Sequence, residues 1–98
     1  MVVNFEQVHN YFERLVFEEV ARFANAHPTF DADMLADVAC VALSRLPARY
    51  VRHDVDMMFY LTEPERHAIN QSLNEALTYA FSFVANRAAK RQAVSETA

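Results

Sequence analysis

The sequence contains no glycine and only three prolines among its 98 residues. Glycine is the residue that tight hairpin turns and phosphate-binding loops use where φ is positive or where the backbone approaches a phosphate closely. Its absence argues against dinucleotide-binding folds that are built from βαβ units with a glycine-rich loop. Because proline is also scarce, the composition favours helices.

The chain has one cysteine, Cys40, which cannot form a disulfide within the chain. It lies in the apolar stretch 37–43, and this position predicts a small buried side chain in a reducing compartment. No stretch reaches the roughly 20 apolar residues that a membrane span requires. The first residues lack the basic and apolar regions of a signal peptide. We therefore expect a cytoplasmic protein that does not enter a membrane.

The formal net charge is −4. Proteins that coat duplex DNA carry a basic balance, so DNA binding is disfavoured. The basic residues are eight arginines and one lysine, a ratio that favours forked, bidentate contacts over diffuse solvated charge. Three of them, Arg45, Arg49 and Arg52, fall within one stretch around Pro47. This stretch is the one place where positive charge gathers.

Apolar residues that recur at three- and four-residue steps predict two helices in the first half of the chain. The first is expected from residue 4 to about residue 24, with Asn4 as its N-cap. The second is expected over residues 33–46, where Pro47 ends it. Its apolar face is rich in alanine, which suits close packing against another helix.

A third helix is predicted from residue 63 to about residue 91, with an apolar stripe that includes Leu73, Leu77 and Val84. Thr62 and Glu65 form a capping-box pattern at its start. Residues 93–98 are expected to be a frayed tail. The length of this helix makes it a candidate for packing across a two-fold axis.

The segment between the second and third helices is less regular. Residues 48–52 have β character, whereas residues 54–61 are compatible with either a short helical turn or an extended segment. The predicted fold class is therefore mainly α, with three principal helices and a short extended segment between the second and third. We expect one domain over residues 1–98, with an ordered core of about 4–91.

No pattern of residues indicates catalysis or metal binding. Ser44 and Cys40 lie in a helix without a recognisable base or oxyanion loop. No two histidines have the i, i+4 spacing of a metal site, and there is no cysteine pair. The possible ligands are His9, His27, His53, His67, Asp31 and Asp33. We expect neither a metal site nor an enzyme.

The arginine cluster has two interpretations. If the chain turns at Pro47, Arg45 and Arg49 converge on one concave site, and arginine makes bidentate hydrogen bonds to phosphate oxygens. Tyr50 or Phe59 would then offer a ring for stacking on a base. In the alternative interpretation the arginines cap the second helix and pair with carboxylates. The candidate partners are Asp37, Asp54 and Asp56.

The chain resembles the late competence development protein ComFB family. The resemblance rests on the stretches NYFERLVFEEV (10–20), DVACVALSRLPARYV (37–51) and RHDVDMMFYLTEPER (52–66). The family pattern has an Asn and a Glu early in the first helix and a segment like A-L-N-x-L-P-P-x-Y at the end of the second. Here that segment occupies residues 42–50. The resemblance covers roughly residues 8–84.

This resemblance implies a small, mainly helical homodimer without enzymatic activity that binds a cyclic dinucleotide, c-di-GMP or c-di-AMP. We expect such a dimer to pass its signal to a downstream protein partner. Carried over by position, the ligand contacts are Arg45, Arg49 and Tyr50, with Asn10, Glu13 and Arg14 as weaker candidates. The alternative is a structural module that binds a protein partner through exposed aromatic residues and has no nucleotide ligand.

The sequence also departs from the family pattern. Some members carry cysteines between the first two helices that are associated with zinc, but the connector 25–33 contains none. Zinc is therefore not expected. Ser44 stands at the position of the motif's Asn, and Ala48 stands at that of its second Pro. These differences leave the choice between the two cyclic dinucleotides open.

Overall fold

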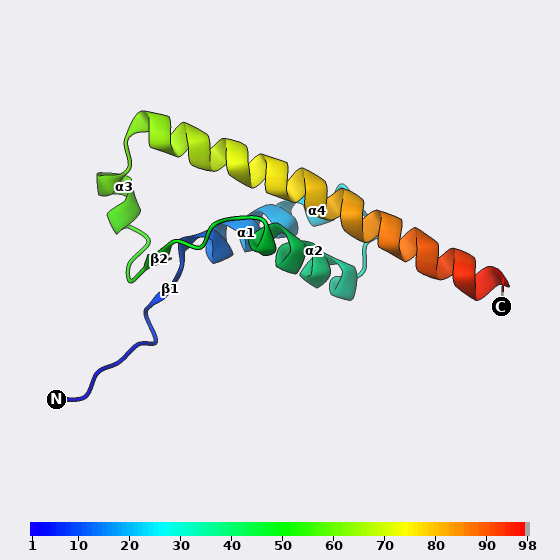
Figure 1. Ribbon diagram of the computed structural model, residues 1–98, viewed down its shortest axis with the longest axis horizontal. Coiled ribbons are helices and arrows are strands. Elements are labelled where there is room, and N and C mark those ends of the chain that lie inside the picture. Colours follow the sequence, from blue (N-terminus) through cyan, green and yellow to red (C-terminus); the bar gives the residue numbers. More distant parts are fainter. Residues whose placement is uncertain (98) are drawn as a thin grey trace.

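The computed structural model describes residues 1–97 and confirms a mainly helical fold (Figure 1). Four helices and one small antiparallel sheet form within these residues, so a short helix is added to the three that the sequence predicts. The elements are β1 (His9–Asn10), α1 (Tyr11–Ala24), α2 (Ala32–Ser44), β2 (Tyr50–Val51), α3 (Asp56–Tyr60) and α4 (Glu63–Thr97).

The first helix begins later than predicted. Its N-cap is Asn10, whose Oδ1 accepts a hydrogen bond from the Phe12 backbone N–H at 3.2 Å. The predicted cap, Asn4, accepts instead from the Glu6 backbone N–H, in a non-helical segment. The start is delayed because β1 pairs with β2, joining His9 to Val51 and Asn10 to Tyr50. A distant strand therefore overrides the local capping signal.

The second helix is close to its predicted range, but it ends at Ser44 and has Arg45 as its C-cap. Its N-cap is Asp31, whose carboxylate accepts a hydrogen bond from the Met34 backbone N–H at 2.8 Å. The prediction of a buried cysteine is wrong, because Cys40 is exposed. It lines an apolar groove between α1 and α2.

The start of α4 confirms Thr62 as its cap, although the Glu65 carboxylate contacts the Thr62 hydroxyl and not the Thr62 backbone N–H of a full capping box. The Thr62 hydroxyl accepts a hydrogen bond from the Glu65 backbone N–H at 3.3 Å and donates to the Glu65 carboxylate at 3.1 Å. The helix continues to Thr97 instead of ending near Arg91. Of the expected frayed tail, Ala98 lies outside the described residues.

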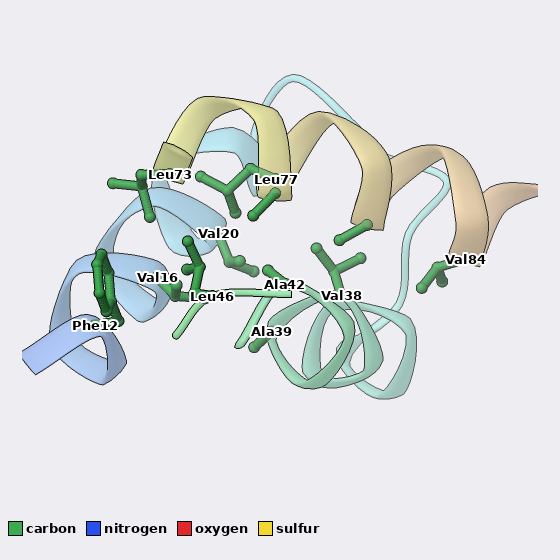
Figure 2. Packing of buried hydrophobic residues seen from close by; sticks show 12 residues of the cluster. Phe12, Val16, Val20, Val38, Ala39, Ala42, Leu46, Leu73, Leu77 and Val84 are labelled. Atoms are coloured by element: carbon green, nitrogen blue, oxygen red, sulfur yellow. The ribbon is translucent and has the colours of Figure 1, made fainter. Parts of the chain in front are cut away.

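The core lies where α4 crosses α1 and α2 (Figures 1 and 2). Small residues, Ala42 on α2 and Ala80 on α4, have no exposed surface, and this permits close approach of the two helices. Larger residues, such as Val16, Val38 and Leu77, fill the space around them. The buried cluster consists of Phe12, Val16, Val20, Val38, Ala39, Ala42, Leu46, Leu73, Ala76, Leu77, Ala80 and Val84.

The molecule is elongated, with extents of 58 × 37 × 22 Å and a radius of gyration of 16.6 Å. A compact domain of about 100 residues has a radius of gyration of about 13 Å. The 35-residue α4 accounts for much of the difference, because a helix of that length spans about 52 Å. Its last turns project beyond the core (Figure 1). Among the described residues, no helix combines the length and apolar character needed to cross a membrane.

Candidate functional site

Two shallow hollows flank Pro47, between the end of α2 and the first half of α4; we call them the Pro47 hollows. The smaller has a volume of about 150 Å³ and is lined by Arg45, Leu46, Pro47, Ser72, Glu75 and Ala76. The larger has a volume of about 290 Å³ and is lined by Phe12, Pro47, Ala48, Arg49, Ala68, Ile69 and Ser72. Because the hollows share Pro47 and Ser72, Arg45 and Arg49 lie in adjacent depressions of one surface.

Arg45 lies over an aromatic ring of α4. Its guanidinium carbon is 3.8 Å from the centroid of the Tyr79 ring, which is a favourable cation–π contact. Tyr79 in turn stacks against Phe83, with ring centroids 5.9 Å apart and an angle of 23° between the planes. The ring of Tyr79 therefore holds the forked Arg45 group at the edge of the smaller hollow.

Arg49 is fixed through its backbone alone. Its N–H donates to the Asn10 side-chain oxygen at 3.0 Å, and its carbonyl accepts from the Tyr11 backbone N–H at 2.7 Å. The Arg49 side chain is exposed and has no hydrogen-bond partner among residues 1–97. Its guanidinium is therefore available to a ligand while the main chain beneath it is held in place.

Within the described part of the chain, Arg45, Arg49 and Arg52 pair with no carboxylate. The part of the alternative interpretation in which the cluster pairs with Asp37, Asp54 and Asp56 is therefore wrong, whereas Arg45 does stand at the C-cap of α2. The carboxylate of Asp54 is held by His9 and Arg14 instead.

The remaining predicted contacts do not line the Pro47 hollows. Asn10 lies beside them, but it caps α1 and holds the Arg49 backbone. Tyr50 is 71% exposed on β2, and Glu13 is exposed on the first turn of α1. Arg14 is bound to Asp54 at 2.8 Å and to Glu18 at 3.0 Å. The structure thus brings Arg45 and Arg49 to the Pro47 hollows, which Tyr50, Glu13 and Arg14 do not line.

A cluster that the sequence did not reveal joins β1 to the loop after β2. The Asp54 carboxylate interacts with His9 Nε2 at 2.5 Å and accepts from Arg14 Nε at 2.8 Å. His9 Nδ1 lies 2.6 Å from the Gln7 carbonyl oxygen. Because both ring nitrogens face acceptors, the contacts favour the doubly protonated, cationic imidazole.

These contacts shift the titration of the cluster. The Gln7 carbonyl, and then the Asp54 carboxylate, raise the pKa of His9 above 6.5. Hydrogen bonds from His9 and then Arg14 lower the pKa of Asp54 below 3.8. The bond to Asp54 also raises the pKa of Arg14. The cluster is therefore fully charged between the two titrations.

We expect His9 to make stability depend on pH. Because its pKa is raised in the folded protein, its contribution is fully present below the unfolded value of 6.5 and is lost as pH rises through the folded pKa. The His9→Gln variant should have a melting temperature slightly below that of the wild type at about pH 6, with a smaller difference at about pH 9. Thermal denaturation of the wild type and of His9→Gln, from about pH 6 to about pH 9, measures the two melting temperatures at each pH.

The matched control is His67→Gln, because His67 is exposed on α4 and has no hydrogen-bond partner among residues 1–97. If the difference in melting temperature between the wild type and His9→Gln stayed constant from about pH 6 to about pH 9, this would contradict a charged His9 in the cluster. At the acid end, the contribution of Asp54 should be lost as pH falls through its lowered pKa, below 3.8.

The two asparagines near the N-terminus give a second test. Asn10→Ala removes the cap of α1 and the acceptor for the Arg49 N–H. We expect a loss of about 1 kcal/mol in the free energy of unfolding, which lies within the usual range for N-caps. Asn4→Ala should cost much less, because Asn4 holds only an exposed turn. Urea denaturation of both variants decides the matter: a larger loss from Asn4→Ala would place the start of the helix at Asn4.

Among residues 1–97, no group of three or more His, Cys, Asp or Glu side chains is arranged to hold a metal ion. The connector between α1 and α2 instead packs aromatic rings against α4. His27 stacks on Phe81, with centroids 4.8 Å apart, and Phe30 and Phe23 contact the same ring. His27, one of the possible ligands, therefore packs against this aromatic cluster.

The model of the family described as late competence development protein ComFB matches residues 9–88, and the chain belongs to this family. The match includes α1, α2, both Pro47 hollows and most of α4. Searches of curated proteins and of solved structures found no match.

Proposed function

We propose that this chain is a non-enzymatic receptor for a cyclic dinucleotide, c-di-GMP or c-di-AMP, with its site at the Pro47 hollows. One observation carries the proposal. Arg45 and Arg49 lie in adjacent hollows that share Pro47 and Ser72, and neither guanidinium pairs with a carboxylate among residues 1–97. Forked donors without an acidic partner are suited to phosphate oxygens and to the acceptor edge of a base.

The chemistry of the ligand fits this surface. A cyclic dinucleotide carries two phosphodiesters and two purines, so a few forked cations and flat surfaces suffice to recognise it. Such a site is compatible with a net charge of −4, which duplex DNA would disfavour. Membership of the ComFB family supports the same ligand class, because the resemblance implies a cyclic dinucleotide receptor.

We further propose that the receptor is a cytoplasmic homodimer that acts as a switch. An apolar groove of about 580 Å³ between α1 and α2 offers a surface for a second copy. It is lined in part by Phe17, Leu35, Ala36, Cys40 and Leu43. A ligand that prefers one arrangement of the segment 46–61 would shift the population toward that arrangement. The changed surface would then be read by a downstream protein partner.

Thermal unfolding with and without ligand tests the proposal. At a concentration about 100-fold above Kd, a ligand adds about 2.7 kcal/mol to the stability of the folded state. For a domain of this size, each 1 kcal/mol raises the melting temperature by roughly 4–8 °C. We therefore expect either c-di-GMP or c-di-AMP to raise it by roughly 10 °C or more. GMP and AMP at equal concentration are the controls, and no shift with either cyclic ligand would contradict the proposal.

The surface of α3 favours a second function. In this alternative the protein is a structural module that binds a protein partner and has no nucleotide ligand. Four neighbouring apolar side chains are largely exposed there: Val55 at 55%, Met58 at 64%, Phe59 at 81% and Tyr60 at 72%. An exposed apolar cluster of this kind commonly marks a protein contact. Absence of any ligand effect, together with loss of partner binding in Phe59→Ser, would support this alternative.

A further inference from the structure

The smaller Pro47 hollow contains both a forked donor and a carboxylate. Arg45 and Glu75 line the same space of about 150 Å³, with Ser72 between the two hollows. Arg45 is held over the Tyr79 ring at 3.8 Å. Glu75 receives one long hydrogen bond, from the Gln71 amide at 3.4 Å, and its carboxylate keeps free acceptor positions because two oxygens offer about four.

Phosphate recognition does not explain Glu75. A carboxylate repels a phosphate oxygen, and Arg45 does not pair with it among residues 1–97. Glu75 is exposed at the hollow that Arg45 also lines, so together they suit a ligand that accepts hydrogen bonds on one edge and donates them on another. The part of a cyclic dinucleotide with this character is its base.

Guanine and adenine differ on these edges. Guanine presents two acceptors, O6 and N7, side by side, and arginine binds this pair bidentately. Its neighbouring edge presents N1–H and the N2 amino group, both of which are donors to a carboxylate. Adenine places an amino donor beside N7, so that it meets the donors of an arginine fork, and its N1 is an acceptor that a carboxylate repels.

We propose that the Arg45–Glu75 hollow is a guanine-selecting base site, in which Arg45 donates to O6 and N7 and Glu75 accepts from N1–H and the N2 amino group. The inference rests on the proposed function and names its ligand as c-di-GMP. Arg49, in the adjacent hollow, is then left for a phosphodiester. Tyr79 is a positioning residue that holds the Arg45 fork.

The test is a pair of calorimetric titrations of the full chain with c-di-GMP and with c-di-AMP. We expect c-di-GMP to bind at least tenfold more tightly. If c-di-AMP binds equally well or better, the guanine site is overturned and the receptor function stands. If neither ligand binds, both proposals fall, so the two failures are distinguishable.

Two substitutions locate the selectivity. Glu75→Gln should reduce the preference for c-di-GMP by about tenfold, because the amide presents a donor to guanine N1–H and accepts fewer hydrogen bonds. Arg45→Lys keeps the charge but loses the fork, so it should weaken c-di-GMP more than c-di-AMP. The control is Glu63→Gln, since Glu63 lies at the start of α4, outside both hollows. An unchanged preference in Glu75→Gln, with the fold intact by circular dichroism, would overturn the assignment.

Discussion

Truncation of Leu77 to alanine is expected to lower the free energy of unfolding by about 2–5 kcal/mol, the range for large-to-small changes in protein cores. Leu77 is 3% exposed and lies among the residues that α4 buries against α1 and α2 (Figure 2). The loss has two parts, the transfer free energy of the removed carbons and the cavity left between three helices. Since domains of this size are stable by only about 5–15 kcal/mol, the variant should unfold at a much lower urea concentration.

The matched control removes more atoms at a lower cost. Phe59→Ala deletes an entire ring, but Phe59 is 81% exposed on α3, and surface substitutions usually change stability by less than about 0.5 kcal/mol. Urea denaturation of Leu77→Ala and Phe59→Ala, at several protein concentrations, compares the loss in the free energy of unfolding at the two positions. If Phe59→Ala were as costly as Leu77→Ala, the ring of Phe59 would have to be buried in solution, against the exposure described above.

The second large effect concerns the ligand. Arg49→Ala should weaken cyclic dinucleotide binding by about 10- to 100-fold, because hydrogen bonds to charged groups contribute about 1.5–3 kcal/mol. The fold should be unaffected, since Arg49 contributes its backbone N–H and carbonyl to the contacts with Asn10 and Tyr11. Alanine keeps both groups. Affinity and stability are therefore separable at this position.

Arg52→Ala is the control for charge. Arg52 is exposed in the same segment, but it lines neither Pro47 hollow. Removing it changes the net charge by the same amount as Arg49→Ala, so any general electrostatic attraction is lost equally in both variants. Binding of a fluorescence-labelled cyclic dinucleotide measures the affinity of each variant. Equal losses of affinity in Arg49→Ala and Arg52→Ala would show that Arg49 acts only through charge.

Much of the fold could be predicted from local patterns. Apolar residues at helical spacing identified the buried stripe of α4, including Leu73, Leu77 and Val84, because a helix must bury its apolar face. The Thr62 and Glu65 pair identified the start of α4, since the cap depends on residues three apart. These features depend on neighbours in the sequence, and a single sequence contains that information.

What sequence reasoning missed depends on contacts between distant segments. Asn4 and Asn10 are both plausible caps, and the pairing of β1 with β2 decides between them. Cys40 lies in an apolar stretch, yet it is exposed and lines the apolar groove between α1 and α2. In both cases, local composition indicates a helix but does not say where the helix starts or which side of it is covered.

The candidate site was predicted in part for the same reason. Arg45 and Arg49 are close in sequence, so their clustering was visible. Tyr79 and Glu75 come from α4, and no local signal connects them to the end of α2. Equally, the pairing of Arg14 with Asp54 depends on the path of the β2–α3 segment, which the sequence left open. The sequence therefore predicts Arg14 as a ligand contact, whereas the structure gives Arg14 a partner within the chain.

The most direct test of the central claim is isothermal titration calorimetry of the wild-type chain with c-di-GMP and, separately, with c-di-AMP. Light scattering on the same sample gives the oligomeric state. The account predicts saturable binding of a cyclic dinucleotide with a Kd of about 1 μM or below, equivalent to about −8 kcal/mol. A well-folded protein that releases no heat with either ligand would contradict it and would leave the arginines at Pro47 without a nucleotide to bind.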